Sequence, residues 1–169
     1  MFYNIIFLFL INISFLNAKE PTLAILKNVY ANDVQQFTYH NYSFMCRPYG
    51  VVSIEDVYRN KKISKTCRDR IEKFYIQHPK SQYFSANILK LSQMYHIKYK
   101  KEKYLIFAKG MKTLSELLIE NGLAIKEPYL KDEIYGYKFD TAQKRASYAK
   151  AGLHKDNVLR NCMIFYKIN

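Results

Sequence analysis

The chain has 169 residues, of which 49% are hydrophobic and 16% aromatic, with only 5 Gly and 4 Pro. This length is about one domain and suffices to bury a core, and the composition excludes a disordered chain, a collagen, a coiled-coil rod and a low-complexity linker. Lys and Arg number 27 against 14 Asp and Glu, which gives a net charge of +13. A protein with this much positive charge favours an anionic partner, which could be nucleic acid, anionic lipid or an acidic glycan.

The first 18 residues carry no charged side chain, and their apolar core is Ile5–Leu16. Twelve residues are too few to span a bilayer of about 30 Å. The small residue Ala18, followed at once by charged residues, predicts a signal peptide over residues 1–18. An uncleaved anchor is the alternative. We expect a mature chain that is extracytoplasmic, either periplasmic or secreted, monomeric and free of the membrane after cleavage.

The three cysteines are Cys46, Cys67 and Cys162. In an oxidising compartment one disulfide is expected, and the odd number leaves at least one thiol unpaired. The spacing does not decide which two cysteines pair. No CxxC pair is present, so a zinc site is not expected.

The first part of the mature chain is typical of strands. Thr22–Val29 is apolar, a turn at residues 31–33 follows, and Val34–Tyr39 and Tyr42–Val52 are joined by a two-residue turn at 40–41. A second hairpin is predicted from Tyr95–Tyr99 and Tyr104–Ala108, which flank the charged turn at residues 100–103.

Helical periodicity begins at Ser64–Gln77, which Pro79 ends, and residues 81–92 are either a loop or a short helix. Thr113 and Glu116 form a capping box that opens a further helix, and Gly122 ends it.

A last helix is expected from about residues 140–141 to Gly152, and the extension from about residue 157 contains the strand-like run Met163–Tyr166. About five strands and three helices in one unit predict an α+β fold, a small barrel with packed helices, as a single domain over residues 19–169.

Several segments resemble the staphylococcal nuclease (thermonuclease) family. The run CRPYGVVSIE at residues 46–55 is similar to the family motif V-R-L-Y-G-I-D-A-P-E, and residues 31–34 resemble its D-G-D-T turn. Residues 110–124 and 142–153 are similar to two of its helices, in the same order and spacing. The resemblance implies a five-stranded OB-fold β-barrel with about three helices.

The resemblance also implies chemistry, namely metal-assisted hydrolysis of phosphodiesters in DNA or RNA. It implies that Arg47 binds phosphate, Glu55 acts as general base or orients water, and Asp33 binds Ca²⁺. The position of the second calcium carboxylate holds Val52, which offers no oxygen, and Asp56 is the candidate substitute.

The position of the family's second catalytic arginine falls on Lys101, which has the charge but not the bidentate geometry of arginine. Lys100 and Lys103 flank it, and Tyr129 and Tyr135 lie near the segment in which the family stacks a base on tyrosine. These four residues are the candidates for contact with nucleic acid.

Each candidate also has a purely structural explanation. Arg47 suits an exposed strand end, Asp33 a turn cap, and Glu55 the first turn of a helix. Packing in a loop explains Tyr129 and Tyr135 equally well.

Two functions from different classes therefore stay open. Retention of Arg47 and Glu55 favours an enzyme, a secreted nuclease. Val52 and the missing second arginine favour a catalytically degenerate relative that binds nucleic acid. A module that binds only proteins is disfavoured, because it has no need of a charge of +13.

Overall fold

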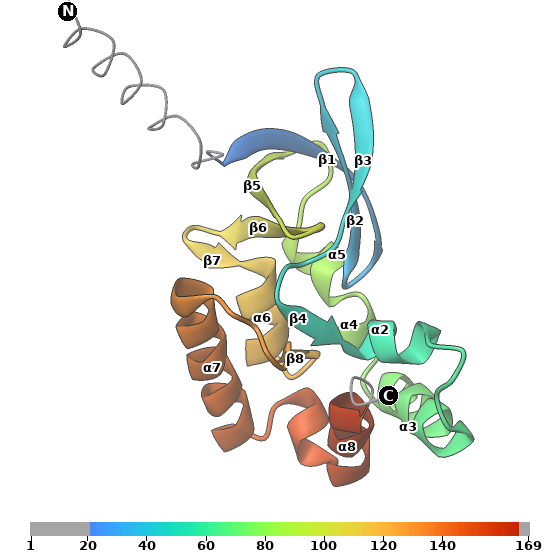
Figure 1. Cartoon of the computed structure of the whole chain (residues 1–169). Helices are drawn as coiled ribbons and strands as arrows, with labels where there is room; N and C mark the ends of the chain where they lie inside the picture. Colours follow the sequence, from blue (N-terminus) through green and yellow to red (C-terminus); the bar gives the residue numbers. More distant parts are fainter. Residues whose placement is uncertain (1–20, 166–169) are drawn as a thin grey trace, which may run out of the picture.

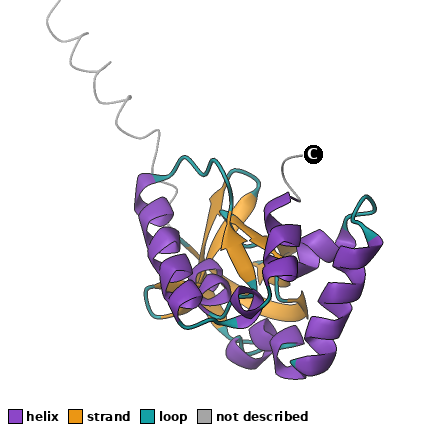
Figure 2. Ribbon diagram, turned by 90° about the horizontal axis from the view of Figure 1, so that it is seen from below, coloured by secondary structure: helices purple, strands orange, loops and turns teal. Residues whose placement is uncertain are grey.

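The computed structural model describes residues 21–165, so the predicted signal peptide lies outside the described residues. Within that range the fold is α+β, with a six-stranded sheet, a two-stranded sheet and seven α-helices. The large sheet occupies one end of the molecule and the helices α3, α7 and α8 the other (Figure 1). Seen from below, the strands lie between helices (Figure 2).

The large sheet has the strand order β3-β2-β1-β5-β6-β7, and all neighbouring strands are antiparallel. Its strands are β1 (Thr22–Ala31), β2 (Val34–Tyr39), β3 (Tyr42–Cys46), β5 (Met94–Lys100), β6 (Lys103–Lys109) and β7 (Lys112–Thr113). The predicted hairpins are confirmed: the two-residue turn at 40–41 is as predicted, and the turn predicted at 31–33 consists of residues 32–33, because Ala31 still belongs to β1.

The predicted strand Tyr42–Val52 is interrupted after Cys46, because Pro48 has no N–H for a ladder and Gly50 has a φ of +72°. A Cβ at Gly50 would lie 2.8 Å from the ring of Phe139. The chain resumes as β4 (Val51–Ser53), which pairs with β8 (Ala124–Lys126) in the small sheet.

The segment between β3 and β4 contacts β6. Tyr49 N donates to Tyr104 O at 2.9 Å, and Tyr104 N donates to Arg47 O at 2.8 Å. These two hydrogen bonds form a short parallel bridge between Pro48, in the segment after β3, and Tyr104 in β6. Over residues 21–165 the strands do not form a closed barrel, so the predicted closed barrel of five strands is not confirmed.

The helices begin where the sequence supplies caps, and their bounds are α2 (Ile54–Arg59), α3 (Lys65–Gln77), α4 (Pro79–Gln82), α5 (Phe84–Ile88), α6 (Leu114–Glu120), α7 (Glu133–Tyr148) and α8 (Asn157–Phe165). The predicted helix at Ser64–Gln77 is confirmed as α3, and the capping box of Thr113 and Glu116 opens α6. Residues 81–92 hold short helical turns rather than a loop alone.

Two predictions about the C-terminal part are wrong. Helix α7 begins at Glu133, capped by Asp132, well before the expected start at residues 140–141. The run Met163–Tyr166 is not a strand where it is described, because residues 157–165 form α8, whose Leu159, Cys162 and Met163 are buried.

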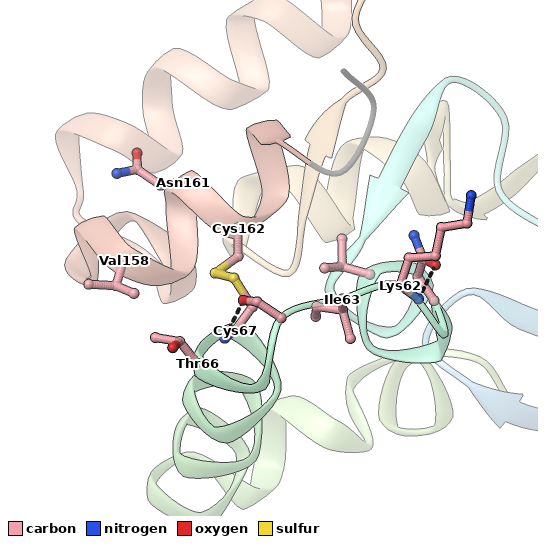
Figure 3. A pocket seen from close by; sticks show the side chains of 10 residues that line it. Lys62, Ile63, Thr66, Cys67, Val158, Asn161 and Cys162 are labelled. Atoms are coloured by element: carbon pink, nitrogen blue, oxygen red, sulfur yellow. Dashed lines mark hydrogen bonds between the residues drawn. A yellow bond between two sulfur atoms is a disulfide. The ribbon is translucent and has the colours of Figure 1, made fainter. Parts of the chain in front are cut away.

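A disulfide joins Cys67 in α3 to Cys162 in α8, with 5.7 Å between the Cα atoms, and Cys46 is a buried free thiol. The crosslink spans 95 residues, a length for which loop closure contributes about 4–5 kcal/mol in the chain-entropy model. The disulfide borders a cavity of about 450 Å³ between α3 and α8 (Figure 3).

Among residues 21–165, no helix combines the length and the apolar character needed to cross a membrane.

Candidate functional site

Helix α2 starts within the family-like motif and positions two consecutive carboxylates. Ser53 caps it: its Oγ accepts from Asp56 N at 2.9 Å, and its own N donates to Asp56 Oδ2 at 3.5 Å. Glu55 and Asp56 thus lie in the first turn, where acidic residues are favoured by the helix dipole. The position of Glu55 in the first turn of a helix, which its structural explanation predicts, is therefore confirmed.

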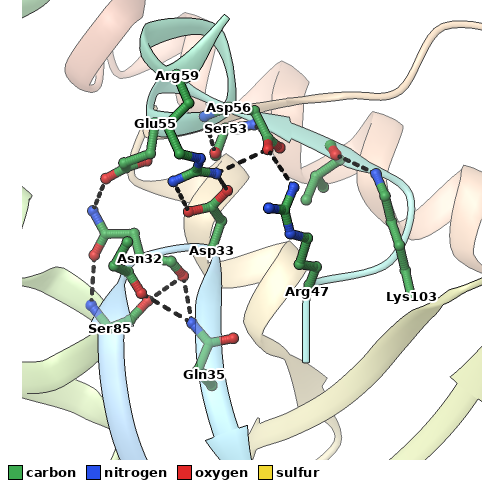
Figure 4. A network of polar contacts seen from close by, with 12 residues as sticks. Asn32, Asp33, Gln35, Arg47, Ser53, Glu55, Asp56, Arg59, Ser85 and Lys103 are labelled. Atoms are coloured by element: carbon green, nitrogen blue, oxygen red, sulfur yellow. Dashed lines mark hydrogen bonds and ion pairs between the residues drawn. The ribbon is translucent and has the colours of Figure 1, made fainter. Parts of the chain in front are cut away.

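Asp56 and Asp33 lie together, as the predicted metal site requires, but a guanidinium lies between them (Figure 4). Arg59 Nη1 donates to Asp33 Oδ1 at 3.1 Å, and Nη2 pairs with Asp33 Oδ2 and donates to Asp56 Oδ1 at 3.0 Å. The side chain of Asp33 is only 3% exposed, and that of Arg59 is 38% exposed. Arg59 therefore neutralises a buried carboxylate from the β1–β2 turn.

The residues present do not fit the Ca²⁺ that the resemblance implies. Ca²⁺ takes six to eight oxygen ligands. Both oxygens of Asp33 are bound by Arg59, and the buried Val52 supplies none. Asp56 Oδ1 is shared by Arg59 and Arg47. Within the described part of the chain, no group of three or more His, Cys, Asp or Glu is placed to hold a metal ion.

Two further cations border the same carboxylates. Arg47 Nη1 lies 3.4 Å from Asp56 Oδ1, and its side chain is 55% exposed. Lys103 Nζ donates to Val51 O at 3.3 Å. Burial lowers the pKa of Lys103, with Arg47 adding to the effect and Asp56 opposing it. Burial raises the pKa of Asp56, Asp33 adds to this, and Arg59 and Lys103 oppose it.

Lys101 does not reach this cluster of Asp33, Asp56 and Arg59. It lies in the β5–β6 turn with a φ of +47°, and its side chain is exposed. Lys103 lies at the first position of β6 and is the lysine whose charge acts on Asp56. The structure thus places Lys103, predicted only as a nucleic-acid contact, beside this cluster, and Lys101, predicted as the catalytic cation, away from it.

An open hollow of about 440 Å³ lies beside the cluster, and we call it the basic hollow. Its lining residues are Arg47, Asp56, Arg59, Asn60, Lys61 and Lys62. Four of them are cationic and one is a carboxylate, so the hollow is suited to an anion.

Glu55 points away from the basic hollow. In Figure 4 it lies beside Asn32, on the opposite side of the Asp33–Arg59 pair from Arg47. Its Oε1 accepts from Asn32 Nδ2 at 2.6 Å and from the Tyr75 hydroxyl at 2.7 Å, whereas Oε2 is buried without a partner among the described residues. The predicted base and the predicted phosphate-binding arginine therefore line different cavities.

The pKa of Glu55 rises from an ordinary value of 4.5 to about 7. Burial is the largest cause, and the nearby Asp33 adds to it. The hydrogen bonds from Tyr75 and Asn32 stabilise the charged form and oppose the rise.

Lys100 belongs to a separate group near the start of α7. Its Nζ lies 2.5 Å from Asp132 Oδ2 and 5.4 and 5.5 Å from the ring centres of Tyr49 and Tyr135. Tyr49 donates its hydroxyl hydrogen to Asp132 at 3.1 Å. Lys100 and Tyr135 are therefore held by contacts within the chain, as packing residues would be. Tyr129 is 89% exposed.

No protein-family model matches the chain, and no curated sequence matches it. The case for a function therefore depends on the geometry of the residues themselves.

Arg59 is the residue of this cluster that the sequence did not predict. A signal for it exists, because Asp56 and Arg59 are three residues apart in a helix, where opposite charges meet on one face. The bond to Asp33, which lies 26 positions away, has no such local signal.

Proposed function

We propose that this protein is a secreted or periplasmic, monomeric relative of the staphylococcal nucleases that binds nucleic acid in the basic hollow without a metal ion. The observation that carries the proposal is the guanidinium of Arg59, which pairs with both Asp33 and Asp56. An internal cation there makes an added Ca²⁺ both unnecessary and poorly coordinated.

The strand order supports the family assignment. β3, β2, β1, β5 and β6 follow one another in the sheet, and the bridge at Tyr104 connects the segment after β3 to β6. We interpret this arrangement as an OB-type barrel whose last seam is reduced to one bridge. The disulfide supports an oxidising location.

The chemistry of the basic hollow supports a phosphate backbone as its occupant. Arg47 is largely exposed and its guanidinium can bind a phosphate through two parallel hydrogen bonds. Lys61 and Lys62 add point charges at the same hollow. Each phosphate neutralised by such a cation releases counterions, so binding should weaken steeply with salt.

The test is a titration of labelled single-stranded DNA and RNA at several salt concentrations, with wild type and Arg47→Ala. We expect the slope of log K against log salt to fall by about 1 when Arg47 is removed. The matched control is Arg145→Ala, because Arg145 is also exposed and lies at the same 3.4 Å from a carboxylate, Glu120, but on α7. An equal fall in the salt slope for Arg47→Ala and Arg145→Ala would contradict the proposal.

Hydrolysis of the bound strand is the second candidate function. It is favoured by the Glu55 carboxyl, whose pKa of about 7 is that of a useful general base. It is disfavoured by the placement of Glu55 outside the basic hollow. The proposal predicts no cleavage with Ca²⁺ or with EDTA; metal-dependent cleavage that disappears in Glu55→Gln would replace binding by catalysis.

A further inference from the structure

A second cavity, of about 150 Å³, lies between the end of β1 and the helices α3–α5, and we call it the tyrosine cavity. Three tyrosines line it together with Glu55: Tyr30, Tyr75 and Tyr83. Tyr30 and Tyr83 are 62% and 60% exposed, which places them at its mouth. Tyr75 is more buried and donates its hydroxyl hydrogen to Glu55.

The carboxyl of Glu55 is held rigidly by its neighbours. Asn32, which donates to its Oε1, also donates to Ser81 O at 2.8 Å and accepts from Ser85 N at 2.8 Å. The side chain of Asn32 is therefore fully engaged and cannot turn to serve Oε2. Within residues 21–165, Glu55 Oε2 stays buried without a partner, an arrangement that costs free energy and is rare in proteins.

The lining of the tyrosine cavity suits a cation. Among the described residues that line it, none is Lys or Arg. The charge that acts on the Glu55 carboxyl is that of Asp33, itself an acid, and Arg59 is engaged with Asp33. Above its pKa of about 7, the Glu55 carboxylate among tyrosine rings combines the two groups that attract ammonium ions, a charged acceptor and aromatic faces.

We propose that the tyrosine cavity binds a small primary ammonium group, which lies among the rings of Tyr30, Tyr75 and Tyr83 and is attracted by the Glu55 carboxylate, whose buried Oε2 it contacts after a small shift of the surrounding side chains. The ammonium group is the end of a linear amine or of a lysine side chain. This inference goes beyond the binding of nucleic acid and does not depend on the basic hollow.

The test uses n-butylammonium as the probe and 1-butanol as its uncharged analogue, with the side-chain amide signal of Asn32 followed by NMR. We expect saturable shifts with n-butylammonium and none with 1-butanol. Glu55→Gln keeps the shape and the acceptor for Asn32 and Tyr75, and should weaken binding by about tenfold or more. Equal shifts with both probes, or unchanged binding in Glu55→Gln, would overturn the proposal.

A second variant keeps the test decisive if Glu55→Gln does not fold. Tyr83→Ala removes an exposed ring at the mouth and should weaken n-butylammonium binding severalfold; unchanged binding would count against the proposal. Spermidine and a lysine-containing peptide, titrated in parallel, show which source binds more tightly. Arg47→Ala should leave n-butylammonium binding unchanged, so failure of this proposal and failure of nucleic-acid binding can be told apart.

Discussion

Glu55 and Asp56 are consecutive acids in one helical turn, yet they lie in opposite electrostatic surroundings. Asp56 borders the basic hollow and contacts Arg59 and Arg47. Glu55 borders the tyrosine cavity and receives neutral hydrogen bonds from Asn32 and Tyr75. Successive helical side chains point about 100° apart, so one helix start can serve two cavities.

The comparison indicates that the presence of a cationic partner, more than burial, distinguishes the surroundings of the two carboxyl groups. Burial raises the pKa of both carboxyls. For Asp56, Arg59 opposes this rise and ties the carboxylate to Asp33. For Glu55, hydrogen bonds oppose it, and one oxygen has no partner in the described part of the chain.

The largest expected effect comes from removing the cation of the first site. Arg59→Met leaves the buried Asp33 unpaired and should lower the free energy of unfolding by about 3 kcal/mol, the low end for a broken buried pair because Arg59 is partly exposed. Urea unfolding at neutral pH measures it. Arg47→Met, at the exposed end of the cluster, should cost under about 1 kcal/mol. An equal loss of unfolding free energy in Arg59→Met and Arg47→Met would contradict the view that Arg59, and not Arg47, neutralises the buried Asp33.

The second prediction concerns the pH dependence of the site without a cation. The pKa of Glu55 is higher in the folded protein than its ordinary 4.5, so its contribution to stability is fully present below pH 4.5 and is lost as pH rises through about 7. The free energy of unfolding of wild type relative to Glu55→Gln should therefore fall by about 2–3 kcal/mol across this range.

Urea unfolding of both proteins at several pH values measures this difference. Glu133→Gln, which removes an exposed acid from the first turn of α7, is the control for loss of a carboxyl near a helix start. A difference between wild type and Glu55→Gln that is constant from pH 4.5 to pH 7 would contradict the prediction.

A third prediction tests whether Arg59 excludes the metal. In Arg59→Met the carboxylates of Asp33 and Asp56 lose their shared cation, so excess Ca²⁺ should stabilise this variant by about 1 kcal/mol or more through binding to the folded state. Thermal unfolding with Ca²⁺ and with EDTA gives the value. No stabilisation in the variant would mean that Val52 and the remaining cations already prevent coordination.

The smallest effect distinguishes the two lysines of the β5–β6 hairpin. Lys103→Met should change the free energy of unfolding by about 1 kcal/mol, because it removes the contacts of Lys103 with Val51 and Asp56 together with the cost of burying its ammonium group. Lys101→Met should change the free energy of unfolding by less than about 0.5 kcal/mol, because Lys101 is exposed in the turn. A larger change for Lys101 than for Lys103 would contradict the placement of Lys103 beside the carboxylates.

Much of the fold follows from local signals in the sequence. The apolar run of β1, the turns at 32–33 and 40–41 and the capping box at Thr113 specify structure over a few residues, and all are found. Helix α8 was not predicted because the β-propensity of Met163 and Ile164 is overridden by packing of Leu159 and Met163 and by the disulfide.

The candidate site was predictable only in part. The family resemblance predicted Asp33 and Asp56 at one metal site and Arg47 as the residue that binds phosphate. The structure brings these three side chains together. The position of Arg59 between the acids, and the direction of Glu55 away from Arg47, depend on how β1, β2 and α2 pack. Such contacts between distant segments leave no periodic signal in the chain.

The most direct test of the central claim is the effect of Ca²⁺ on the thermal unfolding of the wild-type protein, from EDTA to about 10 mM, above the range in which weak extracellular sites are filled. If Arg59 takes the place of the metal, the unfolding temperature should not change. A saturable rise that disappears in Asp33→Asn would show that Ca²⁺ displaces Arg59, and the claim that Arg59 replaces the metal would be wrong.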